Sequence, residues 1–579
     1  MLALQFKLES SFKNYHFFLA AAILYPVFFI FHFGDLTDTG FHLTNYHFFF
    51  EYLSEGRINK FTWFADFLGA LWIELLPAGG VLWIKVFYII NFALIVYFSH
   101  LVLKLVVPDV YKLGPLFLAG AVFSERATNY TFCYDISSWL FSLISIYCIL
   151  VGIQRNQRFR LALAGFFIMV AASNRIGNAV VLIFLPLFLV YINYHNFDKN
   201  VKRTLNRSIL NLSAVLWGAF FYLLLVFVVF KLFGLNHFWR DFIFSSSNSH
   251  GDGSYAFYNL IKIYVLDVYK FFNFSLLGTA VVFSFSLICF LAHKRFNPGI
   301  FRNMLFLGLF FLLAYYFLSN CSYQSKLKFL YPFILIPFGI FSFLKYNKYS
   351  PPLLLFFFFA VSQIAGTNTG AFLKLNYSAL LFLPISVAMF DDFFSTPKVQ
   401  SYQFKRIYYF LLFSLFLFSL FSRICYVYGI YETGPAIRLS TNHKIKVDKM
   451  KGIYAPANMS QHVENVVFYL KKYSSGTKYL FIYGQQPAFY YLSGLKPSHP
   501  NYWIANNVTT PSEVFASLNH NILVNDFKPI VLDTKDNIFG EKGQNMLDHF
   551  LCANEYLLVI EQPTFSIWVN QKTLTAIRF

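Results

Sequence analysis

Two carboxylates stand directly after the first long apolar run of the chain. Asp35 and Asp38 lie in the stretch Gly34-Asp35-Leu36-Thr37-Asp38-Thr39-Gly40. Either could be a general base, because a carboxylate can accept a proton, and the plain alternative for Asp38 is that it caps the next helix, since Asp is a preferred N-cap. We expect an amphipathic helix from Gly40 to Glu55 after them. One stripe of that helix has the pattern of a face in water: Thr44, His47, Glu51 and Glu55.

Further charged residues stand beside later apolar runs. Asp135 precedes one run, where a negative side chain is also favoured by the helix dipole. Cations in comparable positions are Arg126, Arg175, Lys326 and Lys328. Fixed positive charge can hold a phosphate, whereas the plain alternative for the lysines is that they reach lipid headgroups. Asp38 and Asp135 together could hold a divalent metal ion through oxygen ligands, but two acids do not establish such a site.

The surrounding sequence is too apolar for a water-soluble protein. The chain has 579 residues, 57% hydrophobic and 13% charged, against about 25% charged in soluble domains. Apolar runs near the bilayer length predict a polytopic α-helical membrane protein with about 13 transmembrane helices, the first being a retained anchor from Tyr15 to Phe33. The six cysteines have no C-x-x-C pair and no metal-ligand spacing. Neither a disulfide framework nor a zinc site is therefore expected.

Basic residues give an independent check on the spans, because cytoplasmic loops are enriched in Lys and Arg. The net charge of +19 falls in short segments between apolar runs, not on one basic face, which argues against nucleic acid as a partner. The expected cytoplasmic loops are 154–160, 195–207, 293–302, 345–349 and 391–406. The expected outer loops are 34–78, 124–135, 174–178, 236–259, 320–326 and 367–376. An odd number of spans then places the C-terminal part outside the cytoplasm.

A change in composition divides the chain into a membrane domain, residues 1–428, and an extracytoplasmic domain, residues 429–579. The helix and strand patterns of the second part predict a mixed α/β fold. Its expected elements are a helix at Ser460–Ser474, strands at Lys478–Tyr483 and Pro529–Asp533, and a hairpin of Tyr556–Glu561 with Thr564–Asn570. Thr510 to Glu513 carries the capping pattern of a helix start, and Ser498 is expected on the surface. No glycine-rich nucleotide-binding loop occurs in the sequence.

In their order along the chain these features resemble the GT-C superfamily of membrane glycosyltransferases, which includes the aminoarabinose transferase, protein O-mannosyltransferase and oligosaccharyltransferase families. Asp38 stands where those families carry an acid in the first outer loop, although Thr39 replaces the Glu that often follows it. Asp135 stands where many members carry a second acid. The stretches 328–332 and 483–494 resemble the opening of a late span and a segment of the outer domain in these enzymes.

The resemblance implies transfer of a sugar from a polyprenyl phosphate or diphosphate to an extracytoplasmic glycan, lipid or protein acceptor, with inversion by direct displacement. Asp38, or its neighbour Asp35, would be the general base, and Asp135 would serve the acceptor or a metal. The donor phosphate would contact a set of cations: Lys328, Lys326, Arg126 and Arg175. A divalent metal ion is used by only some of these families. The expected location is the inner membrane, in cell-envelope glycan biosynthesis, with a periplasmic C-terminal domain.

Three other classes of protein stay open on the sequence. A transporter or flippase would favour charge pairs inside the membrane, whereas the acids here cluster in outer loops. A polysaccharide polymerase of another fold would use the same lipid. A non-catalytic scaffold of the same fold is the third class, because a fold does not establish chemistry.

Overall fold

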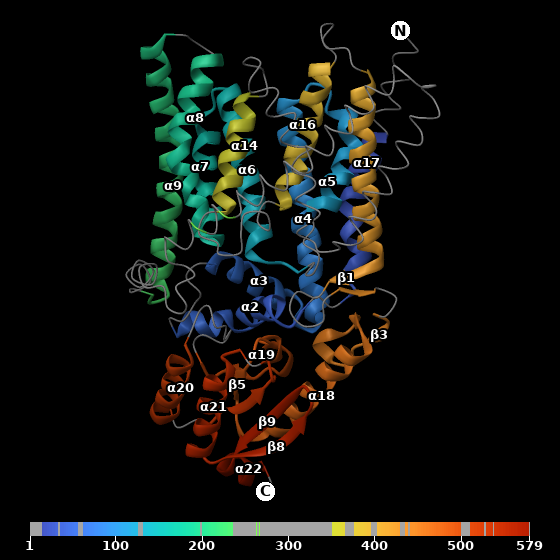
Figure 1. Cartoon of the computed structure of the whole chain (residues 1–579). Helices are drawn as coiled ribbons and strands as arrows, with labels where there is room; N and C mark the ends of the chain where they lie inside the picture. The colour runs from blue at the N-terminus through green and yellow to red at the C-terminus, as the bar shows by residue number, and fades with distance from the viewer. Residues whose placement is uncertain are drawn as a thin grey trace, which may run out of the picture.

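The computed structural model describes both ends of the membrane domain and most of the C-terminal domain. The described residues are 14–32, 35–55, 62–124, 131–196, 200–235, 262, 266, 350–364, 376–394, 402–428, 435–437, 441–499, 510–525, 528–536 and 538–577. Long helices fill one half of the molecule, and a mixed sheet with its helices fills the other (Figure 1). Two shorter helices lie between the two halves.

The membrane half contains apolar helices that run roughly parallel to one another (Figure 1). Four segments of the described chain are long and apolar enough to cross a bilayer: Pro77–Val106, Tyr134–Gln154, Ile176–Tyr194 and Val201–Leu232. The helices are α4 (Gly80–Val106), α5 (Gly114–Ser124), α6 (Tyr134–Gln154), α7 (Arg158–Asn174), α8 (Val181–Asn196), α9 (Val201–Leu232), α14 (Ser350–Ile364), α16 (Ala379–Phe394) and α17 (Tyr402–Cys425). The expected total of about 13 spans stays a prediction, because residues 267–349 lie outside the described part.

The first expected span is shorter than the sequence suggests. It is the apolar segment Asn14–Phe29, which finishes in the 3-10 helix η1 (Tyr25–Phe29). Pro26, inside the expected helix, explains the change, since proline cannot donate the hydrogen bond that continues an α-helix.

Small residues let two membrane helices approach closely. A Cβ atom added at Gly165 of α7 would lie 1.8 Å from the carbonyl oxygen of Val215, and one added at Gly218 of α9 would lie 1.7 Å from that of Ala162. Glycine at both positions allows backbone contact, which is a common way of packing helices where lipid supplies no hydrophobic driving force.

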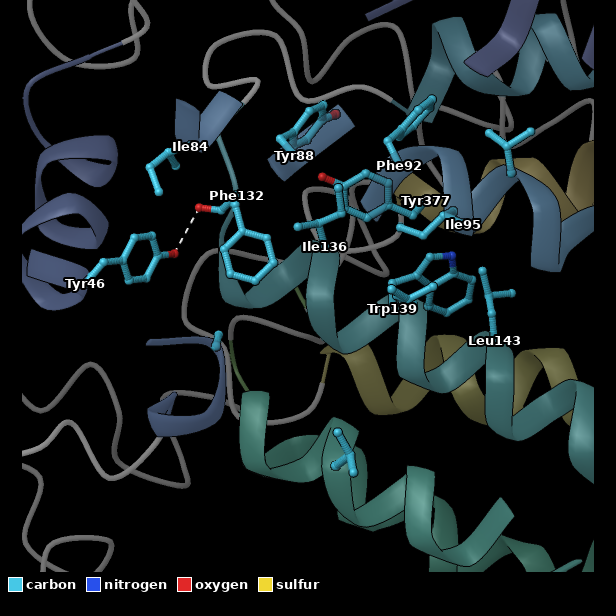
Figure 2. Packing of buried hydrophobic residues seen from close by; sticks show 14 of the residues in the cluster. Tyr46, Ile84, Tyr88, Phe92, Ile95, Phe132, Ile136, Trp139, Leu143 and Tyr377 are labelled. Atoms are coloured by element: carbon cyan, nitrogen blue, oxygen red, sulfur yellow. Dashed lines mark hydrogen bonds between the residues drawn. The ribbon is translucent and has the colours of Figure 1, made fainter. Parts of the chain in front are cut away.

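Aromatic and branched side chains join α4 to α6. Tyr88 and Phe92 of α4 and Trp139 of α6 are buried in one cluster (Figure 2). The same cluster reaches the loop after the first expected span, because the Tyr46 hydroxyl donates to the carbonyl oxygen of Phe132, just before α6 (2.9 Å; Figure 2). The packing therefore fixes the start of α6 against the loop that follows the first span.

That loop folds into helices α2 (Asp38–Ser54) and α3 (Trp63–Leu75), which lie across the ends of the membrane helices (Figure 1). The helix expected from Gly40 to Glu55 is confirmed, with its start two residues earlier. Gly69 of α3 makes room for the Tyr46 ring, because a Cβ atom there would lie 2.5 Å from that ring.

The C-terminal domain is a mixed α/β unit on the far side of α2 and α3 (Figure 1). Its sheet has the strand order β6-β5-β7-β9-β8, in which β5 is parallel to β6 and β7, and β9 is antiparallel to β7 and β8. The strands are β5 (Tyr479–Tyr483), β6 (Lys496–Pro497), β7 (Ile530–Asp533), β8 (Tyr556–Gln562) and β9 (Phe565–Asn570). The helices are α18 (Ala457–Tyr473), α19 (Ala488–Ser493), α20 (Pro511–Asn525), α21 (Gly540–Ala553) and α22 (Gln571–Ile577).

Short elements connect the sheet domain to the membrane half. β1 (Tyr426–Tyr428) pairs with β2 (Pro435–Ile437), and β3 (His443–Lys444) pairs with β4 (Tyr454–Ala455). The Tyr454 amide donates to the carbonyl oxygen of Phe31, after the first span (2.7 Å). The domain boundary expected at 428/429 stays a prediction.

The expected elements of this domain are present with shifts of one to three residues. α18, β5, β7 and the β8–β9 hairpin occupy the predicted stretches. The capping box also forms, because the Thr510 amide donates to Glu513 Oε2 (3.0 Å). Ser498 is not on the surface as expected: it is buried directly after β6, with its amide donating to the carbonyl oxygen of Leu480 (2.9 Å).

The stripe of α2 expected to face water is also different in the structure. Thr44 and His47 of this stripe contact the C-terminal domain, and Glu51 and Glu55 form ion pairs with Lys496. The polar stripe of this amphipathic helix thus binds another polar surface. The sequence pattern alone cannot distinguish such a surface from one in water.

Candidate functional site

The start of α2 is built around Asp35. Its Oδ1 atom accepts hydrogen bonds from the Thr39 amide (2.9 Å) and the Thr37 hydroxyl (3.1 Å), and its Oδ2 atom accepts one from the Thr39 hydroxyl (3.4 Å). Asp35 is 1% exposed. These bonds satisfy a free amide of the first helical turn, so the capping role considered for Asp38 belongs to Asp35.

Asp38 is the first residue of α2 and is partly exposed. His42 and Asn45 follow it at spacings of four and seven residues, which places all three on one stripe of the helix. The His42 ring meets the Tyr134 ring edge to face, with centroids 5.4 Å apart, and stacks on Tyr46 at 6.0 Å. The stripe that begins with Asp38 is therefore the one that meets the start of α6.

Asp135, the residue after Tyr134, forms an ion pair with Arg175. Asp135 Oδ1 and Arg175 Nη1 are 3.4 Å apart, and the side chains are 13% and 9% exposed. Asp135 lies in the first turn of α6 and Arg175 at the C-cap of α7. Because burying a charge without a partner is costly, this pair fixes the start of α6 to the end of α7.

A polar network lies behind the ion pair. Asn178 donates to the Ser138 hydroxyl (2.6 Å), and Gln363 of α14 donates to Asn178 Oδ1 (2.6 Å) and to the Ser142 hydroxyl (3.1 Å). All four side chains are at most 3% exposed. The network connects α6, the 3-10 helix η4 (Ile176–Val180) and α14, so it stiffens the frame that holds Asp135 and Arg175.

Lys85 is a buried cation that the sequence reasoning missed. Its Nζ atom donates to the carbonyl oxygen of His32 (2.7 Å), and it lies within electrostatic reach of Asp35. The signal in the sequence is a single Lys in the first turns of an otherwise apolar run. Lys85 thus connects the start of α4 to the end of the first span.

Asp66 is a second residue that the sequence reasoning missed. The Thr62 hydroxyl donates to its Oδ2 atom (2.9 Å), whereas its Oδ1 atom is buried without a hydrogen-bond partner among the described residues. Burial raises the pKa of the Asp66 carboxyl to about 8. Asp66 is close enough to Tyr46 of α2 to influence it electrostatically. A carboxyl that is neutral at physiological pH therefore lies near α2.

The structure thus brings together some of the predicted site residues. Asp35 and Asp38 lie at the start of α2. Asp135 lies at the start of α6, which α2 contacts through His42 and Tyr134, and it pairs with Arg175. Lys326, Lys328 and Arg126 lie outside the described residues. Within the described ranges, no group of three or more His, Cys, Asp or Glu side chains could hold a metal ion. Asp135 already pairs with the guanidinium group of Arg175, and this positive charge disfavours a metal cation at Asp135.

Comparison with known proteins finds similarity to a solved structure. No family model matches the chain, and no curated protein matches it. The chain is similar to ArnT from Cupriavidus metallidurans, solved with bound undecaprenyl phosphate, at 10% sequence identity and a TM-score of 0.39, over 95% of this chain and 97% of that one. Values this low do not identify a shared activity.

Proposed function

We propose that this chain is a membrane glycosyltransferase that moves a sugar from a polyprenyl phosphate or diphosphate to an extracytoplasmic acceptor. One observation carries the proposal: Asp38 begins a helix that contacts the start of α6, where Asp135 forms a largely buried ion pair with Arg175. Phosphate is a good leaving group, so such an enzyme mainly aligns the acceptor, removes its proton and stabilises negative charge. An acid and nearby cations meet those needs.

In the proposed step, the Asp38 carboxylate removes a proton from an acceptor hydroxyl or amine. The acceptor's lone pair attacks the anomeric carbon, and the bond from that carbon to the phosphate oxygen breaks. The phosphate leaves with the electron pair on the opposite face, which inverts the anomeric centre. Asp38 is preferred to Asp35 as the base because Asp35 is buried and already accepts three hydrogen bonds.

The Asp38→Asn variant tests this role. Asn keeps the size and polarity of the side chain but cannot accept the proton, so we expect turnover to fall roughly 10²-fold at unchanged thermal stability. The measurement is release of undecaprenyl phosphate from a panel of radiolabelled undecaprenyl phosphate hexoses by protein in lipid nanodiscs, with a cell-envelope extract as acceptor.

Asp35→Asn is the matched control. It weakens the cap of α2, so it should lower the melting temperature while turnover per folded molecule is kept. Full turnover in both single variants would end the proposed mechanism and would favour a transporter, polymerase or scaffold.

We also propose that cations at the outer face hold the donor phosphate, with Lys328 as the first candidate and Lys326, Arg126 and Arg175 beside it. Negative charge develops on the leaving phosphate, which needs fixed positive charge. Lys328→Ala should weaken binding of undecaprenyl phosphate, measured by native mass spectrometry, and leave binding of undecaprenol unchanged.

Lys112→Ala is the control for the Lys328 variant, because Lys112 is an exposed lysine paired with Asp109. If the wild type and both variants bind undecaprenyl phosphate equally, Lys328 does not hold the donor phosphate, and its side chain reaches lipid headgroups instead.

A further inference from the structure

We infer that the C-terminal domain positions the catalytic helix α2 by binding the stripe opposite Asp38, so that sugar transfer depends on this docking. This inference rests on the function proposed above. The docking stripe consists of Gly40, Thr44, His47, Glu51 and Glu55. At 100° per residue these positions lie on the opposite side of α2 from Asp38, His42 and Asn45.

The docking begins with backbone contact at Gly40. A Cβ atom there would lie 2.2 Å from the backbone nitrogen of Ala488, the first residue of α19. The same Ala488 amide donates to the carbonyl oxygen of Leu36, just before α2 (3.1 Å). Contact this close leaves α2 little freedom to shift, because backbone atoms cannot move aside as a flexible side chain can.

A second layer of contacts lies one turn further along α2. The Thr44 hydroxyl donates to the carbonyl oxygen of Pro487 (2.9 Å). The His47 ring meets the Tyr491 ring edge to face, with centroids 5.4 Å apart. Lys449 closes this layer, since its Nζ atom donates to the carbonyl oxygen of Tyr491 (2.5 Å) and lies 4.5 Å from the centre of its ring.

An ion pair closes the far end of the stripe. Lys496 Nζ lies 3.1 Å from Glu51 Oε2 and also pairs with Glu55. The Lys496 side chain is 16% exposed. One cation thus binds two acids that lie one turn apart on α2, which fixes the rotation of the helix about its axis. Rotation is the movement that would turn Asp38 and break the contact of His42 with Tyr134 at the start of α6.

The domain is well placed for this task because its parallel strands end towards α2. The segment 484–487, which follows β5, leads directly into the contacts at Pro487 and Ala488. Gly484 in this segment adopts a φ of +154° and lies against Thr534, after β7. The rigid core of the sheet therefore sets the position of the docking segment.

A charge-reversal series tests the inference. Lys496→Glu replaces the attraction to Glu51 and Glu55 by repulsion, and the triple variant Lys496→Glu, Glu51→Lys, Glu55→Lys restores opposite charges. The control is Lys572→Glu, at an exposed lysine of α22 (Gln571–Ile577), which lies at the end of the same domain away from α2 (Figure 1). The measurements are hydrogen–deuterium exchange of the peptide 38–54 and turnover with the undecaprenyl phosphate hexose panel.

We expect Lys496→Glu to raise exchange in the peptide 38–54 and to lower kcat roughly 10-fold, because small displacements of a catalytic group are costly. KM for the donor should change less than kcat. The triple variant should recover both properties, and Lys572→Glu should match the wild type in both.

Each other result has a separate meaning. Unchanged exchange in Lys496→Glu would overturn the docking role whatever the activity. Raised exchange with wild-type kcat, in a preparation where Asp38→Asn is inactive, would overturn the positioning role and leave the proposed function standing. Full activity of both Asp38→Asn and Asp35→Asn would instead remove the proposed function, and the docking would then be judged by exchange alone.

Discussion

Buried ionisable residues near α2 are held by specific partners. Asp35 accepts three hydrogen bonds from two threonines, Lys85 donates to a backbone carbonyl group, and Asp135 pairs with Arg175. Asp66 differs, because one of its oxygen atoms is buried with no hydrogen-bond partner among the described residues. It is therefore the residue of this group whose protonation should affect stability most directly.

The pKa of Asp66 predicts how stability depends on pH. Burial raises it to about 8, above the ordinary value of about 3.9. Between these values the folded protein keeps a proton that the unfolded chain has lost, so stability falls as pH rises from about 4 to about 8 and levels off above. The Asp66→Asn variant cannot ionise. Its melting temperature should therefore rise relative to the wild type as pH is raised through this window.

Melting curves from pH 5 to pH 9 in detergent check this prediction. Asp109→Asn is the control, since Asp109 is an exposed acid paired with Lys112, and its curve should run parallel to that of the wild type. If the Asp66→Asn curve also runs parallel to the wild type, Asp66 is ionised in the folded protein and the assigned burial effect is wrong.

Two modes of close packing hold the helices, and both depend on glycine. Gly40 brings α2 against the backbone of α19, and Gly165 and Gly218 bring α7 against α9. The first contact is between the membrane half and the C-terminal domain, and the second is within the membrane half. Their disruption should therefore have different consequences.

Gly165→Leu should destabilise the membrane half. The new side chain would begin 1.8 Å from the Val215 carbonyl oxygen, so α7 and α9 must separate, at a cost of about 1–3 kcal/mol or more. We expect a lower melting temperature and less monodisperse protein in size-exclusion chromatography. Ser213→Leu is the control, because Ser213 is exposed on α9. Wild-type stability of the Gly165→Leu variant would contradict the packing.

Two basic segments of the membrane half lie together in the whole molecule. Asn156, between α6 and α7, accepts a hydrogen bond from Arg207 near the start of α9 (3.3 Å), so two of the basic segments expected in the cytoplasm lie together. The C-terminal domain lies at the opposite end of the membrane helices (Figure 1). This arrangement supports the proposal that the C-terminal domain is outside the cytoplasm.

Cys552 provides a native test of that topology, because it is exposed on α21. A membrane-impermeant maleimide should label it in intact cells, and Cys552→Ser should remove that signal. In the Cys552→Ser background, Gln157→Cys, between α6 and α7, should react only after lysis. If Cys552 is protected until the cells are lysed, the C-terminal domain lies inside the cell and the proposed orientation is wrong.

The sequence by itself determined the elements that follow a strong local pattern. Apolar runs near the bilayer length predict the long helices, and alternating or capped segments predict β5, β7, the β8–β9 hairpin and α20. These patterns are readable because lipid requires a whole span to be apolar, and because caps satisfy backbone groups within a few residues of the chain. The acids at the start of α2 were found because they directly follow the first apolar run.

Only the tertiary structure decided what the polar residues of these elements do. Asp38 and its neighbour Asp35 are rival candidates for the base in the sequence, but Asp35 is buried in a cap and Asp38 is partly exposed. The polar stripe of α2 faces a second domain rather than water, and Lys85 and Asp66 have roles set by residues far away in the sequence. A side chain's charge is local, whereas its burial and its partners depend on contacts made by the folded chain.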